Sequence, residues 1–299
     1  MADSASDSNA LTSSFLSNLL PAARLSQHAR LTPLDTPRAA RPANEAVVVE
    51  RFSGHEGIDT LFDFQVDVLA TSAQFDPFDL VGEELTLRLL QADGSTRAWH
   101  GQLAGADALG SDGGLARFRL RLQPWLAALA LRRDSFVYAN QSVQGIVSEV
   151  FADHLAGHFS FLAAQELPVR PTCVQYRESD LDFVRRLLAQ EGLSWRFEHD
   201  QAASQDGGAA DDDTAPSRHK LVIFDRHASL PACPLQAIRF HRVDASEASD
   251  SITHWRAWRR VQPNSVQRSA WDASVLHAPL GQADSALALG DVPLLEGHD

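Results

Sequence analysis

Apolar and polar residues alternate in several short stretches of this 299-residue chain. Phe62, Phe64, Val66 and Val68 alternate with polar residues, which indicates a strand with one buried face. The same period recurs at residues 85–89, 96–103 and 118–122, and Asp93-Gly94 is a hairpin signal between the first two. Short strands joined by close turns predict a sandwich or a barrel, and the period alone does not separate these two folds.

Two other stretches repeat apolar residues with the period of an α-helix. The first begins after Ser142, and the second begins after Ser179, which forms a capping-box pair with Asp182. Gly192 is suited to end the second helix, and alternation from residue 193 to 197 then predicts a strand. The apolar helix faces comprise Val143, Ile146, Val147, Val150 and Phe151, and Leu181, Val184, Leu187 and Leu188.

These patterns predict an α+β fold that is mainly β. We expect a flexible arm at residues 1–45, where Ser, Ala and Pro are frequent, and a first β-barrel-like domain at residues 46–125. An α/β section follows at residues 126–199, then an acidic linker at 200–219 with Asp211-Asp212-Asp213. Residues 220–299 are predicted to form a second, incomplete β domain, with strands expected at residues 221–224, 238–241, 252–258 and 266–271.

The net charge limits the classes of binding partner, and the number of cysteines limits the disulfide and metal sites that the chain can form. The net charge of −13 disfavours nucleic acid and anionic membranes, which bind clustered positive charge. The chain has two cysteines, Cys173 and Cys233, which are too few for a disulfide framework or a Cys-based zinc site. A single disulfide between them stays an open alternative. No apolar run reaches the roughly 20 residues that span a bilayer, and the N-terminus lacks a secretory signal pattern, so we expect synthesis in the cytoplasm.

Two clusters have residue types that can carry chemistry. Glu178, Asp180 and Asp182 could act as acids and bases, but charge and capping at a helix N-terminus explain all three. His154 and His158 are spaced i, i+4 and could share a helix face as metal ligands. No third ligand is identifiable, and Gly157 indicates that the helix ends there.

The remaining motifs also favour structural interpretations. Ser53-Gly54-His55-Glu56-Gly57 lacks the spacing of a hydrolase or zinc-protease motif and is predicted to be a turn. Residues 255–260 mix Trp with Arg, as single-strand binders do, but an amphipathic strand suits an acidic chain better. We therefore predict no catalytic, cofactor-binding or metal-binding residue.

Several segments, in order, resemble the N-terminal region of the VgrG family, the spike or tip proteins of bacterial type VI secretion. That region is related to the hub proteins of contractile phage tails. The most specific match is the stretch from Gln175 and Tyr176 through Glu191-Gly192 to Phe197. The other matching segments are residues 52–64, 81–82, 97–101, 120–126, 131–135, 239–242 and 271–272.

The resemblance implies phage tail hub-like β-barrel domains with a small α/β section between them, in one protomer of a homotrimer. It also implies docking on a hexameric Hcp-type tube, contacts with baseplate and effector proteins, export through the secretion apparatus, and no enzymatic activity. Neither nucleic acid binding nor stable membrane insertion is expected.

Members of this family continue into an OB-like domain and a β-helix needle. Residues beyond 250 show no repeating short β period, so we expect a hub part without the needle, as a fragment, a truncated product or a split variant. Two alternatives stay open. One is a hub of a contractile phage tail or phage-like particle, and the other is a hydrolase or toxin that uses Glu178, Asp180 and Asp182 or His154 and His158.

Overall fold

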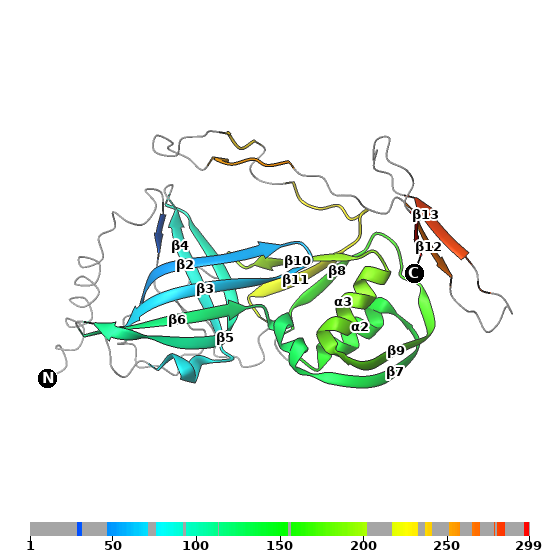
Figure 1. Cartoon of the computed structure of the whole chain (residues 1–299), viewed down its shortest axis with the longest axis horizontal. Helices are drawn as coiled ribbons and strands as arrows, with labels where there is room; N and C mark the ends of the chain where they lie inside the picture. Colours follow the sequence, from blue (N-terminus) through cyan, green and yellow to red (C-terminus); the bar gives the residue numbers. More distant parts are fainter. Residues whose placement is uncertain are drawn as a thin grey trace. The chain divides into compact units, whose positions relative to one another are not determined.

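The computed structural model divides the chain into two compact units, residues 1–233 and 234–299 (Figure 1). It describes residues 29–31, 47–70, 76–91, 94–112, 114–154, 157–201, 217–232, 237–240, 251–257, 265–269, 278, 280–284 and 296–298. Most of the predicted N-terminal arm and residues 202–216 of the predicted acidic linker lie outside these ranges. No helix among the described residues is long and apolar enough to cross a membrane.

The first unit begins with a curled six-stranded sheet in the order β1-β4-β5-β6-β3-β2 (Figure 1). All neighbouring strands in it are antiparallel. The strands are β1 (Ala29–Leu31), β2 (Val47–Gly57), β3 (Thr60–Ala70), β4 (Glu84–Gln91), β5 (Thr96–Asp112) and β6 (Leu115–Gln123). The mainly β, α+β fold class predicted from the sequence is confirmed.

The apolar residues that alternate along these strands fill the core on the inner face of the curled sheet. Phe62, Val66, Leu85, Leu87 and Leu120 are buried in the core, as their period of two predicts. The predicted hairpin joins β4 to β5, although Asp93 lies outside the described residues. β5 extends well past the expected residue 103, because it pairs with β4 up to Gln102 and then with β6 as far as Asp112, with bulges between Leu103 and Gly105 and between Ala108 and Gly110.

The outward residues of β3 and β6 form charged pairs. Asp67 accepts hydrogen bonds from Arg119 (2.7 Å) and Arg51 (2.5 Å), and Arg121 pairs with Asp63. The hydrogen bond from Arg119 is the largest factor that lowers the pKa of Asp67, and Arg51 adds to it. The alternating arginines of β6 are therefore engaged by acidic residues of the same sheet.

The predicted turn at residues 53–57 is wrong, because β2 continues through these residues and the chain reverses at Ile58-Asp59. Gly54 is needed for a different reason: a Cβ there would lie 2.6 Å from the Asp63 carbonyl oxygen and would clash with the Phe64 ring. Asp59 anchors the hairpin tip, since its backbone N–H donates to the Trp195 carbonyl and its carboxylate accepts from the Trp195 N–H, both at 2.9 Å.

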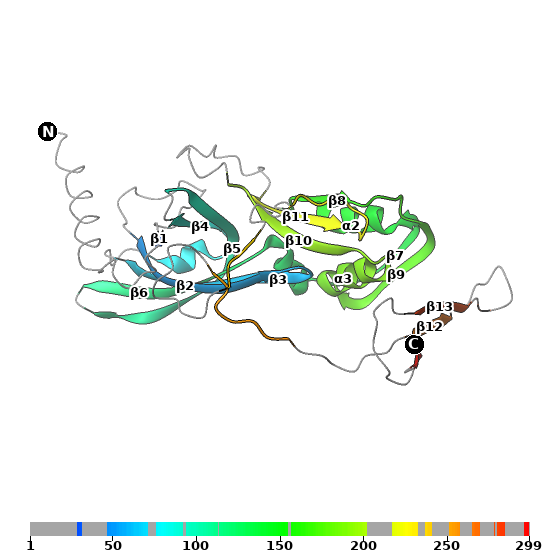
Figure 2. The same ribbon diagram turned by 90° about the horizontal axis from the view of Figure 1, so that it is seen from above.

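An α/β section completes the first unit. The helices α2 (Val143–Ala152) and α3 (Asp180–Gln190) lie between a two-stranded sheet and a three-stranded sheet (Figures 1 and 2). The two-stranded sheet pairs β7 (Arg133–Ser142) with β9 (Val169–Ser179), and a 3-10 helix (Trp125–Leu131) precedes it. The other sheet has the order β10 (Ser194–His199), β11 (His219–Phe224), β8 (Phe159–Leu162).

Both predicted helix starts are confirmed. The Ser142 hydroxyl accepts from the Gly145 N–H at 3.2 Å, and the Ser179 hydroxyl accepts from the Asp182 N–H at 3.1 Å. Gly192 has the left-handed φ of 66° that ends α3. One strand is placed differently from the prediction: the residues expected to open the second β domain form β11, which pairs with β10 and β8 because its apolar residues complete this core.

In the part of the second unit that the structure describes, the strands form a small sheet in the order β13-β12-β14. Its strands are β12 (Ser265–Ser269), β13 (Leu280–Asp284) and β14 (Glu296–His298). The strand expected at residues 252–258 is absent over the described residues 252–257, where an isolated bridge joins Phe240 to Ile252. The sequence pattern missed β13, all of whose residues are exposed, because an exposed strand has no apolar alternation to reveal it.

Candidate functional site

The carboxylate cluster predicted as capping is engaged within the protein. Asp182 lies at the start of α3, where one of its oxygens accepts from the Ser179 hydroxyl at 2.7 Å. Glu178 accepts from Arg186 at 2.5 Å. The contacts of Asp182 agree with the capping assignment, whereas Glu178 lies in β9 before the N-cap and is bound to Arg186 instead.

Asp180 has a further role that the sequence did not reveal. Its side chain is buried, accepts from the Gln175 amide at 2.8 Å and pairs with Arg132 Nε at 3.1 Å. Its backbone N–H also donates to the Arg132 carbonyl oxygen at 3.1 Å. Asp180 therefore joins the start of α3 to the residue before β7.

The two histidines of the possible metal site do not converge. α2 ends at Ala152, so His154 lies beyond it, with Nε2 3.8 Å from an Asp180 oxygen. His158 instead contacts the Ser217 carbonyl oxygen through Nδ1 at 3.0 Å. Within the described residues, no group of three or more His, Cys, Asp and Glu is placed to hold a metal ion. Cys173 is buried as a free thiol, and Cys233 lies outside the described ranges.

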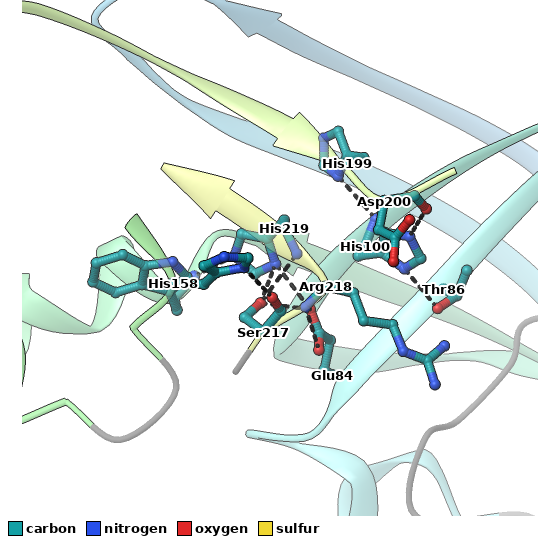
Figure 3. Close-up of polar contacts among 10 residues, drawn as sticks. Glu84, Thr86, His100, His158, His199, Asp200, Ser217, Arg218 and His219 are labelled. Atoms are coloured by element: carbon teal, nitrogen blue, oxygen red, sulfur yellow. Dashed lines mark hydrogen bonds and ion pairs between the residues drawn. The ribbon is translucent and has the colours of Figure 1, made fainter. Parts of the chain in front are cut away.

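A different polar cluster, which the sequence did not predict, lies where the six-stranded sheet meets the α/β section (Figure 3). Glu84, at the start of β4, accepts from the Ser217 hydroxyl at 2.6 Å and from the Arg218 N–H at 3.1 Å. His219, fully buried on β11, contacts the same carboxylate through Nδ1 at 2.9 Å. Residues more than 130 positions apart are joined here, so no local spacing could reveal the cluster.

Ser217, His219 and Glu84 are the residue types of a catalytic triad, but their geometry differs from one. In a triad the serine bonds one ring nitrogen and the acid the other. Here Ser217 Oγ (2.6 Å) and Glu84 both contact Nδ1, while Nε2 accepts the Trp125 backbone N–H at 2.9 Å. The hydroxyl is therefore not placed for activation by Nε2, and the arrangement joins three chain segments.

Two more histidines extend the cluster toward β5. His100 is fully buried, with Nδ1 2.9 Å from the Thr86 hydroxyl and Nε2 2.7 Å from the Asp200 carbonyl oxygen (Figure 3). His199, at the end of β10, accepts the His100 backbone N–H on Nδ1 at 3.1 Å. The Phe62 ring lies 5.2 Å from that of His199, measured between centroids, so an aromatic core side chain borders the polar groups.

The protonation states follow from burial and these partners. Burial alone would raise the pKa of Glu84, but its hydrogen bonds with His219, Ser217 and the Arg218 N–H outweigh burial and lower that pKa to about 2. Burial lowers the pKa of His199 to about 3 and also lowers the pKa of His100. At neutral pH the cluster therefore contains an ionised Glu84 and neutral His100 and His199.

The outer face of the β7–β9 sheet carries exposed apolar side chains. Val137 and Val174 are directly opposite in register, and Tyr176 lies one pair further along the same face. Their exposed fractions are 60%, 44% and 67%. We call these three residues the outer β7–β9 face.

These features define a class of protein: a mainly β scaffold whose buried polar groups tie distant segments together. Comparison with known proteins identifies the family. The chain belongs to the phage tail baseplate hub (GPD) family, whose model matches residues 55–291.

The curated relatives are spike proteins of type VI secretion. VgrG1b of Pseudomonas aeruginosa is 28% identical over 250 residues, 83% of this chain and 31% of that protein. VgrG4b of the same organism is 36% identical over 158 residues, 52% of this chain and 19% of the relative. A third relative, described as the actin cross-linking toxin VgrG1 of Vibrio cholerae, is 29% identical over 201 residues, 64% of this chain and 17% of that protein. The chain spans about a third of the length of its first curated relatives.

Solved structures agree with this assignment. The E. coli c3393 protein, described as a type VI secretion component similar to the T4 bacteriophage tail proteins gp27 and gp5, superposes with a TM-score of 0.54 at 26% identity. The match covers 65% of this chain and 49% of that chain. A tail protein from Neisseria meningitidis has the same fold, with a TM-score of 0.52 at 12% identity over 89% of this chain and 70% of its own.

Proposed function

We propose that this chain is the structural hub of a type VI secretion spike, assembling as a homotrimer on a hexameric Hcp-type tube for contractile delivery of effectors. The observation that carries the proposal is the baseplate hub match over residues 55–291, together with spike-protein relatives aligned over as much as 83% of the chain. The chain acts without catalysis, contacts baseplate and effector proteins, is made in the cytoplasm and is exported through the secretion apparatus.

The described side chains support a mechanical role. The candidate acids Glu178 and Asp182 are bound to Arg186 and Ser179, and Asp180 is buried against Arg132. Such contacts hold the start of α3 and the start of β7 in a fixed relative orientation. The outer β7–β9 face adds exposed apolar area of the kind that protein contacts cover.

Mass measurement in solution tests the assembly. We expect sedimentation analysis of the full chain at rising concentration to show three times the 32.7 kDa protomer mass, and a larger complex with an Hcp-type tube protein. A chain that stays monomeric at high concentration and ignores the tube protein would contradict the proposal. Binding of a phage tail-tube protein in place of the Hcp-type protein would favour the phage-particle alternative.

A surface variant tests where the copies meet. We expect Val137→Lys combined with Val174→Lys to weaken the trimer at least tenfold, because two charges would enter an apolar contact. Leu131→Lys is the matched control, since Leu131 is 90% exposed and lies off this face. Both variants should keep the circular dichroism spectrum of the parent chain. Equal self-association of the two variants would exclude the outer β7–β9 face as the contact.

A further inference from the structure

The edge of β5 at Ala98 and His100 is covered by single side chains in place of a strand. Ala98 donates its N–H to the Gln201 side-chain oxygen and accepts from the Gln201 amide, both at 3.0 Å. The His100 N–H donates to His199 Nδ1 at 3.1 Å. We call these contacts of Ala98 and His100 with residues 199–201 the seam.

The seam requires neutral histidines. His199 Nδ1 accepts a hydrogen bond, so the ring proton is on Nε2, and a second proton would convert the acceptor into a donor facing the His100 N–H. Nε2 is buried and makes no hydrogen bond to any residue that the structure describes. The hydrogen bonds of His100 could accommodate a second ring proton, because the Thr86 hydroxyl can accept as well as donate. The positive charge of a protonated His100 would, however, be fully buried.

The charged groups around the two rings offset such a charge only in part. From β2, Glu56 lies 4.0 Å from His199 Nε2, and from β4, Glu84, already bound to His219, favours the protonated form of both rings. Arg97 of β5 and His219 of β11 oppose protonation of His199, and Arg218 and His219 oppose protonation of His100. Asp200 contributes its carbonyl oxygen to His100, and β3 presents the Phe62 ring.

We propose that the seam is an acid-opened latch, in which protonation of His199 and His100 releases residues 199–201 from the edge of β5 while both helices and the rest of the sheet stay folded. The contacts that remain elsewhere are independent of these rings. Asp59 still joins the β2–β3 tip to Trp195, and α3 keeps its own cap. This inference does not depend on the secretion role.

The size of the effect follows from proton linkage. Burial holds the pKa of His199 near 3, so the closed seam does not bind its proton at pH 5, whereas an exposed histidine with a pKa of about 6.5 does. The ratio of open to closed seam therefore rises about tenfold for each pH unit below 6.5, or roughly thirtyfold at pH 5. His100, whose pKa is also lowered by burial, acts in the same direction.

Residue-resolved amide exchange on the full chain tests the latch. The Ala98 and His100 amides donate across the seam, and amides within β3 and α3 serve as internal references. Between pH 7 and pH 5, we expect protection factors, which remove the intrinsic pH dependence of exchange, to fall at least tenfold at the seam and to stay constant in the references. Equal loss everywhere would mean global unfolding and would overturn the proposal.

Two variants assign the effect to the histidines. In His199→Gln the side-chain oxygen can still accept the His100 N–H, and in His100→Gln the amide can serve both Thr86 and Asp200, yet neither takes a proton. We expect either variant to reduce the acid-induced loss at least threefold. His227→Gln is the matched control, because His227 is exposed in a turn. If both seam variants kept the parent pH dependence, the histidines would not control the seam.

Direct titration provides a check that needs no substitution. Imidazole signals of the parent chain should show His199 and His100 neutral while the seam amides are protected. Titration of both rings near pH 6.5, with the seam amides still protected, would overturn the latch.

Discussion

At the scale of a residue, Asp180 shows how one buried carboxylate fixes two elements. It is almost fully buried, and Gln175 and Arg132 hold it from two sides. Removal of one partner from a buried pair leaves the other group uncompensated, which typically costs 3–5 kcal/mol. Arg132 is 43% exposed and can turn to water, so we expect Asp180→Ala to lower the free energy of unfolding by about 3 kcal/mol.

Asp134→Ala is the control for this prediction. Asp134 lies 3.6 Å from the same Arg132, but its side chain is 45% exposed. Exposed ion pairs contribute less than about 1 kcal/mol, so this variant should remain close to the parent chain. Urea denaturation at pH 7 measures both variants, and equal losses would show that burial is not what makes Asp180 important.

At the scale of an element, the β2–β3 hairpin depends on a close approach at Gly54. A Cβ there would lie 2.6 Å from the Asp63 carbonyl oxygen, which belongs to the paired strand and cannot easily move. We expect Gly54→Ala to destabilise the protein by about 2 kcal/mol, as overpacked sites do. In the control Gly57→Ala, the nearest atom would be Thr60 Oγ1 at 3.7 Å, and a change within about 0.5 kcal/mol is expected.

Thermal and chemical unfolding of these two glycine variants decide between the possible roles of Gly54. A large loss for Gly54→Ala alone supports the close approach between strands. Equal stability of the two variants would mean that the hairpin can open locally to accommodate the methyl group.

Elements whose signals lie within a few residues could be predicted from the sequence. The cap at Ser179, the end at Gly192 and the alternation of β3 each depend on neighbours along the chain, and all are confirmed. The exceptions depend on distant contacts. The sequence pattern predicts a turn at Gly54 because the residue that crowds it lies across the hairpin, and the apolar pattern of β11 does not show that its partners are β10 and β8.

At the scale of the whole molecule, the polar cluster where the six-stranded sheet meets the α/β section could not be predicted from the sequence. We call this cluster the junction. Glu84, His100 and His219 are on strands of two different sheets, and their meeting depends on how those sheets pack. His100 and His199 are separated by about a hundred positions and have no shared motif. The apolar patterns and the family resemblance predict the fold class, whereas the polar groups that join its parts depend on how distant segments pack.

Glu84 gives this junction a measurable pH dependence. Because its pKa is about 2 in the folded chain, against 4.5 ordinarily, ionised Glu84 stabilises the fold above pH 4.5, and this stabilisation is lost as pH falls through 2. The shift corresponds to roughly 3 kcal/mol. In Glu84→Gln the amide nitrogen also replaces an acceptor of the Arg218 N–H. We therefore expect this variant to be about 3 kcal/mol less stable at pH 7.

The deficit of Glu84→Gln should narrow in acid, because only the parent chain takes up a proton there. Urea midpoints at pH 7, 4 and 2.5 measure this convergence. Glu178→Gln is the matched control, since Glu178 is likewise a hydrogen-bonded carboxylate, bound to Arg186, but lies outside the junction. A constant difference between the parent chain and Glu84→Gln at all three pH values would show that the hydrogen bonds of Glu84, and not its charge, hold β4 to β11.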